Sequence, residues 1–446
     1  MDIRVFPVGG FNEVGKNMTA VQVDDEIVIF DMGFFLPKLI SFEEEGGDRR
    51  NLTPAGLKRL GAIPDDTCLD SLKDKVKAIV ASHCHLDHIG AIPYLAEKYN
   101  CPVIGSPYTL AVLKTLLKDE RIRIPNEFVE LIGRKKYKIS KNLEVELLHV
   151  THSTPHTVLI VVHTREGAIV YGNDFKLDNN PVLWDSPDYR RMKSIGNRGV
   201  KALIMDTLYA GTSGKTPSEM VAREMLKDVM LGTHGEGHAM IVTTFASQLA
   251  RLHSAIEFGR KLNRKVIMMG RSMHKYVTTA EKVGLVSFSK NVEILGYARQ
   301  VEKKLKEIEK RGRDKYLILC TGNQAEPGAI LTRMSTGSLP FKFVQDDHVI
   351  FSTKTIPVTP NLENRRLMED RLKKKKARLF LDVHASGHIY REDMRDMLKI
   401  FKPENVIPCQ GTHEHMKGLI EMCEDMGYKL GKTVHMLNDS QALELK

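Results

Sequence analysis

The sequence has few of the features that mark secreted, disulfide-stabilised or membrane-embedded proteins. None of its six cysteines lies in a Cys-x-x-Cys pair, so neither a disulfide framework nor a cysteine zinc site is expected. Reduced cysteines in the cytoplasm are the simplest interpretation. No apolar run approaches the roughly 20 residues that cross a bilayer. Residues 1–6 are expected to form a first strand and not a signal peptide.

The composition is that of a globular protein with an excess of positive charge. A chain of 446 residues is long enough for two domains, and 42% of its residues are hydrophobic. Lysine and arginine number 66 against 56 aspartates and glutamates, which gives a net charge of +10. This excess favours a polyanionic partner, although many basic proteins bind no nucleic acid.

One short stretch carries most of the chemistry. Residues 76–81 read as a buried strand, and residues 89–95 read as a turn that enters a helix. Between them lies the pattern His-x-His-x-Asp-His, formed by His83, His85, Asp87 and His88. Imidazole nitrogens and carboxylate oxygens are the ligands that zinc prefers. Four such groups on one tight loop can supply ligands to two metal ions.

Further metal-ligand types follow other predicted strands. They are Asp31 after strand 27–30, His152 after strand 143–148, Asp174 after strand 168–171, and Asp206 at the end of strand 200–206. Separate strands that deliver histidine and aspartate to one rim can assemble a metal site. A glycine-rich turn at residues 9–17 would let the backbone approach a ligand closely.

The pattern changes between residues 207 and 373. Helix and strand signals alternate there, which predicts a second α/β domain. From residue 374 strands that are followed by histidines return, as in residues 1–206. We therefore expect one domain formed by 1–206 and 374–446, with 207–373 inserted. Residues 34–75 are expected to be an irregular surface insertion. The basic run Lys373–Lys376 is interpreted as either a solvated face or a phosphate-facing patch.

These motifs resemble the metallo-β-lactamase superfamily across 1–206 and 374–446. The inserted region resembles the β-CASP domain of its nucleic-acid-processing branch. Within that branch the short archaeal form of ribonuclease J fits best. The supporting stretches are Gly9–Asn17, Thr244–Ser247, Gly270–Met273, Thr321–Pro327 and Val383–His388. The resemblance implies an α/β fold, namely an αββα sandwich with an inserted β-CASP α/β domain.

The resemblance also implies roles for individual residues. It predicts two zinc ions per chain, with Mn²⁺ or Mg²⁺ as substitutes. The first ion would be held by His83, His85 and His152, the second by Asp87 and His88, and Asp174 would bridge them. Asp31 would orient a metal-binding histidine. The catalytic group would comprise Asp87, His88, Asp206 and His388, with His388 protonating the leaving oxygen. The RNA phosphate would contact Ser247, His384, Ser386 and His388.

Two positions depart from the family pattern. Gln410-Gly411 stands where the family usually has His-Gly. His413 would supply the missing ligand if the loop bends, and His415 is the less favoured alternative; otherwise the second metal has one ligand fewer. His156 stands where relatives mostly have aspartate, and either an orienting role or a surface position fits it.

The resemblance predicts a zinc-dependent 5′→3′ exoribonuclease that starts at a 5′-monophosphate end, with some endonuclease activity, in RNA decay or maturation. Single-stranded RNA is the expected substrate, and a cytoplasmic homodimer is the expected form. A non-catalytic RNA-binding scaffold, a DNA-processing nuclease and a small-molecule hydrolase are the alternatives. The retained ligand residues argue against the scaffold, and the inserted domain and basic charge argue against the small-molecule hydrolase.

Overall fold

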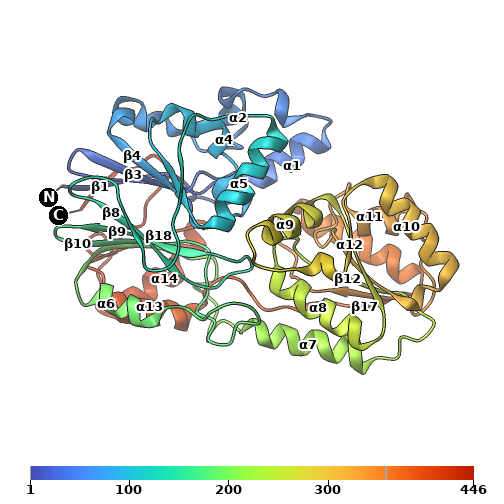
Figure 1. Ribbon diagram of the computed structural model, residues 1–446. Coiled ribbons are helices and arrows are strands. Elements are labelled where there is room, and N and C mark those ends of the chain that lie inside the picture. Colours follow the sequence, from blue (N-terminus) through green and yellow to red (C-terminus); the bar gives the residue numbers. More distant parts are fainter. Residues whose placement is uncertain (1, 357–358, 446) are drawn as a thin grey trace. The chain divides into compact units, whose positions relative to one another are not determined.

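The computed structural model describes residues 2–356 and 359–445 (Figure 1). Within it the chain forms two compact units. Unit 1 consists of Met1–Asn179, Ser186–Thr216 and Gly387–Lys446, and unit 2 consists of Asn180–Asp185 and Pro217–Ser386. Each unit has its own β-sheets and its own helices.

Unit 1 contains two sheets. The first has the strand order β19-β1-β2-β3-β4-β5-β6 and the second has the order β18-β11-β10-β9-β8-β7. The strands of the first sheet are β1 (Ile3–Gly9), β2 (Met18–Val23), β3 (Glu26–Phe30), β4 (Val76–Val80), β5 (Val103–Gly105), β6 (Phe128–Glu130) and β19 (Leu443–Leu445). Those of the second are β7 (Lys136–Lys138), β8 (Glu144–His149), β9 (Val158–Thr164), β10 (Gly167–Gly172), β11 (Val200–Asp206) and β18 (Asn405–Cys409).

Helices cover the outer face of each sheet in unit 1 (Figure 1). The short α3 (Leu86–Ile89), α4 (Ile92–Leu95) and α5 (Pro107–Glu120) accompany the first sheet, and α6 (Tyr189–Gly196), α13 (Arg391–Phe401) and α14 (His413–Asp425) accompany the second. Buried side chains of both sheets, among them Phe30, Val80 and Val170, belong to one hydrophobic cluster. The αββα sandwich that the resemblance implied is therefore confirmed.

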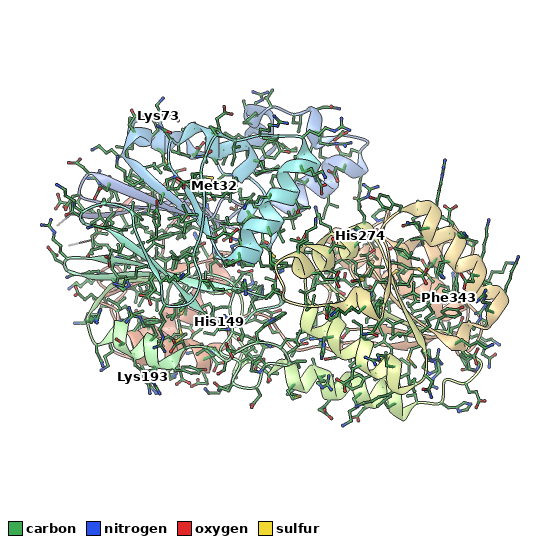
Figure 2. All side chains as sticks on the ribbon, viewed as in Figure 1. Met32, Lys73, His149, Lys193, His274 and Phe343 are labelled. Atoms are coloured by element: carbon green, nitrogen blue, oxygen red, sulfur yellow. The ribbon has the colours of Figure 1, made fainter. Side chains whose placement is uncertain are left out.

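The all-side-chain view shows how this core is enclosed. Met32, just after β3, has no exposed surface and lies within unit 1 (Figure 2). Lys73 and Lys193 are exposed and stand on its outer surface (Figure 2). Met32 thus contributes to the apolar interior while Lys73 and Lys193 remain in solvent, as the hydrophobic effect favours.

Unit 2 is built on a parallel six-stranded sheet of order β14-β13-β15-β12-β16-β17. Its strands are β12 (Met240–Thr243), β13 (Lys265–Met269), β14 (Glu293–Leu295), β15 (Tyr316–Cys320), β16 (His348–Phe351) and β17 (Arg378–Phe380). Its helices are α7 (Glu219–Gly232), α8 (Leu249–Lys261), α9 (Arg271–Lys282), α10 (Ala298–Arg311), α11 (Ile330–Ser335) and α12 (Thr359–Lys374). A parallel sheet packed with helices is the second α/β domain that the alternating pattern predicted.

Residues 34–75 differ from expectation. The segment contains α1 (Leu36–Glu44) and α2 (Pro54–Leu60), together with the 3₁₀ segments Arg49–Asn51 and Asp66–Lys75. Thr53 caps α2 by accepting a hydrogen bond from the Gly56 N–H, and Gly61 ends it with φ +71°. The expectation of an irregular segment was therefore wrong, because both helices are too short to show a clear periodicity, and α2 is stabilised by its two caps.

The return from unit 2 to unit 1 also differs in detail from the expected boundary at residue 374. Strand β17 pairs in parallel with β16, so residues 378–380 extend the sheet of unit 2. The compact units change at residues 216/217 and 386/387. Strand pairing between distant segments is not visible in local sequence, which explains the shift.

A buried ion pair holds together the segments of unit 2 that carry the predicted phosphate-binding serines. Arg251, in the first turn of α8, has no exposed surface. Its Nε and Nη2 donate to the two carboxylate oxygens of Glu219 at 2.6 and 2.9 Å. Its Nη1 donates to the carbonyl oxygens of Ser352 and Val383 at 2.7 and 3.1 Å. One guanidinium therefore ties α7, α8 and the segment before Ser386 together.

Replacing this guanidinium should destabilise unit 2. Arg251→Met should lower the free energy of unfolding by about 3–5 kcal/mol, because it leaves the Glu219 carboxylate buried without its partner. Urea denaturation followed by circular dichroism measures the change. Lys227→Ala, which removes an exposed ion pair to Glu224, is the control and should have no measurable effect. Equal stability of Arg251→Met and the unaltered protein would contradict this role.

Candidate metal centre

The functional side chains of unit 1 gather at the carboxyl ends of its strands. In the first sheet β3 and β4 are parallel, and in the second β10, β11 and β18 are parallel. Strand β8 also runs with β10, since both are antiparallel to β9. Parallel strands place their carboxyl ends at one edge, which is where α/β folds hold their ligands. The residues that follow these ends are Asp31, His83–His88, His152, Asp174, Asp206 and Gln410.

Three of these residues turn the chain sharply at the strand ends. Asp31, Asp174 and Gln410 have φ values of +57°, +50° and +56°. Residues other than glycine rarely adopt this left-handed conformation, and its strain tends to be concentrated at functional sites. Each turn directs a side chain into the site instead of along the sheet.

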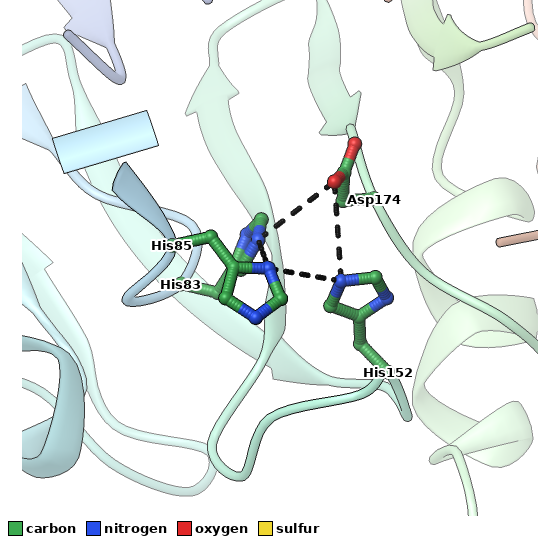
Figure 3. A group of neighbouring side chains, drawn as sticks. All are labelled: His83, His85, His152 and Asp174. Atoms are coloured by element: carbon green, nitrogen blue, oxygen red, sulfur yellow. Dashed lines mark hydrogen bonds and ion pairs between the residues drawn. The ribbon is translucent and has the colours of Figure 1, made fainter. Parts of the chain in front are cut away.

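The first group of ligand atoms comprises His83, His85, His152 and Asp174, whose donor atoms all lie within 4.8 Å of one another (Figure 3). The Nε2 of His83 lies 3.0 Å from the Nδ1 of His85, which lies 3.3 Å from the Nε2 of His152. Nitrogens that share one tetrahedral zinc ion at the usual bond length lie about 3.3 Å apart. The spacing therefore fits a single ion.

Hydrogen bonds orient two of these imidazoles for metal binding. The Nδ1 of His152 donates to the carbonyl oxygen of Gly387 at 2.7 Å. A Cβ at Gly387 would lie 2.9 Å from the His152 ring, so only glycine allows this approach. The Nδ1 of His83 lies 3.0 Å from the Ser82 hydroxyl, which itself donates to Asp31. Both rings thus present the Nε2 lone pair to the common centre.

Burial keeps the three imidazoles in the neutral form that binds metals. It lowers the pKa of His83 and of His152 well below the ordinary value, and neighbouring imidazoles lower them further. Burial also lowers the pKa of His85 to about 4. A neutral imidazole has a free lone pair, and a protonated one does not. The first group is therefore suited to a divalent cation at neutral pH.

The second group comprises Asp87, His88 and Asp174. The Nδ1 of His88 lies 2.7 Å from Asp31, so its Nε2 faces Asp174 and Asp87 at 3.3 and 3.5 Å. Burial opposes the charged form of His88, but the carboxylates of Asp174, Asp87 and Asp31 together hold its pKa well above the ordinary value. The two carboxylates of this group therefore favour positive charge beside them.

Asp31 lies outside the ligand groups and contacts the ring of His88. Its carboxylate has no exposed surface and accepts hydrogen bonds from the Ser82 backbone N–H, the Ser82 hydroxyl and the Tyr171 hydroxyl, in addition to its contact with His88. It therefore links β3 to β4 and fixes the ring of a residue in the second group.

The third group comprises Asp174, Asp206 and His388. The Nδ1 of His388 lies 2.8 Å from the Asp206 carboxylate and 3.8 Å from that of Asp174. Burial opposes protonation of His388, yet Asp174 and Asp206 raise its pKa to about 9. His388 thus favours the protonated form at neutral pH beside the Asp174 carboxylate.

Gln410, and not His413, reaches the ligand groups. The Gln410 amide nitrogen donates to Asp174 at 2.7 Å, and Asp87 lies 3.4 Å from it. His413 is exposed at the start of α14, with its Nε2 2.8 Å from the Asn438 side-chain oxygen. His415 caps the same helix through Thr412. The helix begins directly at His413, so the loop does not bend that ring toward the site, and the expected replacement ligand is absent from this place.

The remaining predicted residues belong to other segments of the chain. Ser247, His384 and Ser386 belong to unit 2, where Ser247 follows β12 and the other two follow β17. Both serines are buried. His156 lies in the turn between β8 and β9 with φ +58°, and burial lowers its pKa to about 4.

Sequence reasoning missed several residues that support the site. Asn17 lies in the glycine-rich turn, where its Nδ2 donates to the Asp87 carbonyl oxygen and lies 3.3 Å from the His88 Nε2. Asn173 donates to Asn17 and to Tyr171. The glycine-rich turn and the Asn-Asp pair at 173–174 were the signals for this network, but neither identifies its partners.

An αββα sandwich with histidine and aspartate groups at its strand ends defines a metal-dependent hydrolase. Residues 12–230 match the metallo-beta-lactamase superfamily, residues 237–367 match the beta-CASP domain of ribonuclease J, and residues 374–437 match the Zn-dependent metallo-hydrolase RNA specificity domain. The chain belongs to the ribonuclease J family, and it is a metal-dependent ribonuclease.

Individual relatives agree with this assignment. The chain is 42% identical to ribonuclease J of Methanocaldococcus jannaschii and 39% identical to that of Pyrococcus abyssi, covering 99% and 97% of those proteins. It is 29% identical to ribonuclease J of Helicobacter pylori, of which it covers 60%. A crystal structure of a protein of unknown function from Enterococcus faecalis shares the fold over the whole chain, with a TM-score of 0.66 at 16% identity.

Among the helices that the structure describes, none has the length and apolar character needed to cross a bilayer.

Removing the orienting carboxylate should weaken metal binding. In Asp31→Asn an amide N–H₂ replaces one acceptor oxygen, so His88 and Ser82 can no longer both be satisfied. We expect about 10- to 100-fold weaker metal binding, measured by competition with a chromophoric chelator. Tyr171→Phe, which removes one donor from Asp31, should produce a smaller loss. Unchanged metal affinity in Asp31→Asn would show that Asp31 only stabilises the fold.

Proposed function

We propose that this chain is a zinc-dependent 5′→3′ exoribonuclease that acts on RNA with a 5′-monophosphate end, in RNA decay or maturation. The observation that carries the metal part is the set of three neutral imidazoles that converge with Asp174 at zinc spacing. The direction of degradation is supported by the resemblance of the serine-containing segments at 247 and 386. The same resemblance supports some endonuclease activity and a cytoplasmic homodimer.

The ligand groups suit two metal ions that share Asp174. The first ion would be held by His83, His85, His152 and Asp174, and the second by Asp87, His88 and Asp174. When bound, such ions lower the pKa of a water molecule and offset negative charge on the phosphate. The chain's part is to hold these ligands rigidly, with Asp31 and Gly387 fixing their orientation.

His388 would supply the proton that the departing oxygen needs. Its Nδ1 is engaged by Asp206, so the proton for the leaving group would come from Nε2. The position of His388 beside Asp174 would place this proton next to the reacting phosphate. Its side chain is 20% exposed, whereas the Asp206 carboxylate is fully buried, so substrate can reach the histidine and not the aspartate.

Ser247, His384 and Ser386 would bind the 5′-phosphate of the RNA. The hydroxyls of two serines are small hydrogen-bond donors suited to phosphate oxygens. Arg251 supports this role indirectly, because it ties the helix that follows Ser247 to the segment that precedes Ser386. The net charge of +10 favours the polyanionic substrate as a whole.

The direction and end requirement can be tested with labelled RNA. A single-stranded RNA with a ³²P 5′-monophosphate should release the label as a mononucleotide, while a 3′-labelled copy should shorten without early release. A 5′-hydroxyl copy should be degraded much more slowly, and chelation of the metal should stop all cleavage. His88→Ala is the inactive control. Release of 3′-terminal nucleotides first, or equal decay of both 5′ ends, would contradict the proposal.

The role of His388 can be tested with a leaving group that needs no proton. His388→Ala should slow RNA hydrolysis by about 10²- to 10⁴-fold, the usual contribution of general acid catalysis. Hydrolysis of a nucleoside 5′-p-nitrophenyl phosphate should fall far less, because nitrophenolate departs without protonation. His413→Ala, outside the ligand groups, is the matched control and should leave both rates unchanged. Equal losses on both substrates would show that His388 is not the proton donor.

A further inference from the structure

Gln410 occupies an unusual position between the backbone of the glycine-rich turn and the carboxylates of the second ligand group. It has no exposed surface. Its Oε1 accepts a hydrogen bond from the Gly15 N–H at 2.8 Å. Its Nε2 donates to Asp174 at 2.7 Å, and Asp87 lies 3.4 Å from the same nitrogen. Each end of the amide therefore contacts a different part of the site.

The partners determine which way the amide points. A backbone N–H can only donate, so the atom facing Gly15 must be the oxygen. Ionised carboxylates can only accept, so the atom facing Asp174 and Asp87 must be the nitrogen. An amide nitrogen has no lone pair available for a metal ion. In this orientation the Gln410 amide donates hydrogen bonds to Asp87 and Asp174, at the place where a bound cation would offset their negative charge.

The backbone holds Gln410 in this orientation. Its N–H donates to the Gly10 carbonyl oxygen at 2.7 Å, and its φ of +56° directs the side chain toward the carboxylates. The following Gly411 lies so close to Thr207 that a Cβ there would be 2.7 Å from the Thr207 hydroxyl. The backbone at Gln410 and Gly411 is therefore packed closely against the glycine-rich turn and Thr207.

The two ligand groups are consequently unequal. The first group offers three neutral imidazoles and one carboxylate. Its histidines His83 and His152 face the Oδ2 of Asp174, whereas Gln410 contacts the Oδ1 of Asp174. The second group offers Asp87, His88 and the shared Asp174, and the Gln410 amide faces both of its carboxylates. A cation entering the second group must replace hydrogen bonds that the first group does not have.

We propose that Gln410 is a built-in competitor for the second metal ion. Its amide N–H₂ takes the place of a cation at Asp87 and Asp174, so the protein holds one divalent ion tightly and accepts the second only when the amide withdraws. This inference rests on the proposed two-metal centre. It differs from the simple loss of a ligand, because a competitor weakens the second ion more than an empty position would.

The same contacts couple the second ion to the glycine-rich turn. Withdrawal of the Gln410 side chain would break the bond from Oε1 to the Gly15 N–H. Asn17 on this turn also contacts Asp87 and His88. Occupancy of the second group should therefore loosen the backbone of residues 10–17, while occupancy of the first should leave it unchanged.

Metal titration of the protein distinguishes a competing Gln410 amide from the simple loss of a ligand. Metal-free protein is titrated with Mn²⁺ by calorimetry, and bound metal is counted by elemental analysis. The unaltered protein should bind one ion tightly and a second much more weakly. Gln410→Ala should bind the second ion about tenfold or more tightly than the unaltered protein, because hydrogen bonds to the carboxylates no longer have to be broken. An affinity for the second ion that is unchanged or weaker in Gln410→Ala would overturn the proposal.

Two further variants test whether impaired folding or the loss of any glutamine side chain could change the metal affinities. Gln410→Met keeps the side-chain volume without a donor, so it should behave like Gln410→Ala even if the smaller side chain impairs folding. Gln441→Ala removes an exposed glutamine side chain and should leave both affinities unchanged. Unchanged binding of the first ion in every variant shows that the centre is intact. Because no step of the titration requires RNA, an inactive protein would refute the proposed nuclease without affecting this result.

Hydrogen exchange provides an independent readout. Peptides covering residues 10–17 should exchange faster when the second ion binds to the unaltered protein. In Gln410→Met these peptides should already exchange fast in the metal-free protein, and their exchange should change little when metal binds. Unchanged exchange in the unaltered protein on binding of the second ion would contradict the coupling.

Discussion

The buried carboxylate of Asp174 is the feature on which the rest of the centre depends. It belongs to all three ligand groups, and the imidazoles of His83, His88 and His152 lie within 3.9 Å of it. A buried carboxylate is strongly destabilising unless positive charge or hydrogen bonds compensate it. Asp174 therefore attracts cations to the site, and its Oδ1 lies 3.8 Å from the Nδ1 of His388.

The scaffold makes this concentration of charge possible at the cost of local strain. Asp31, Asp174 and Gln410 each adopt a left-handed turn at a strand end. Gly33 lies so close to Asp87 that a Cβ would overlap the Asp87 carbonyl oxygen. The extensive core between the two sheets of unit 1 compensates these unfavourable conformations. The strand ends thus determine where the ligand residues stand, which suits a reaction that depends on precise positioning.

The interactions of Gln410 give the centre an asymmetry that the shared fold does not require. In the first group the imidazoles are neutral and oriented by Gly387 and Ser82. In the second, an amide donor already faces the carboxylates. The family membership explains the metal chemistry, whereas the inequality of the two groups comes from this chain's own residues. A ribonuclease whose second metal binds weakly would depend on metal supply in the cell.

The amino-acid sequence by itself predicted an inserted α/β domain and the histidine and aspartate residues of the centre, because alternating helix and strand signals and the His-x-His-x-Asp-His spacing are local. The αββα sandwich was implied by the resemblance of its motifs to a known superfamily. The sequence could not reveal the helices of residues 34–75, which are too short for a clear periodicity, or the membership of β17 in the sheet of unit 2. It suggested His413 as a replacement ligand, since distance along the chain was the only guide. Only the tertiary structure decided that Gln410 enters the site, because a single left-handed residue and the start of α14 set the directions of side chains three positions apart.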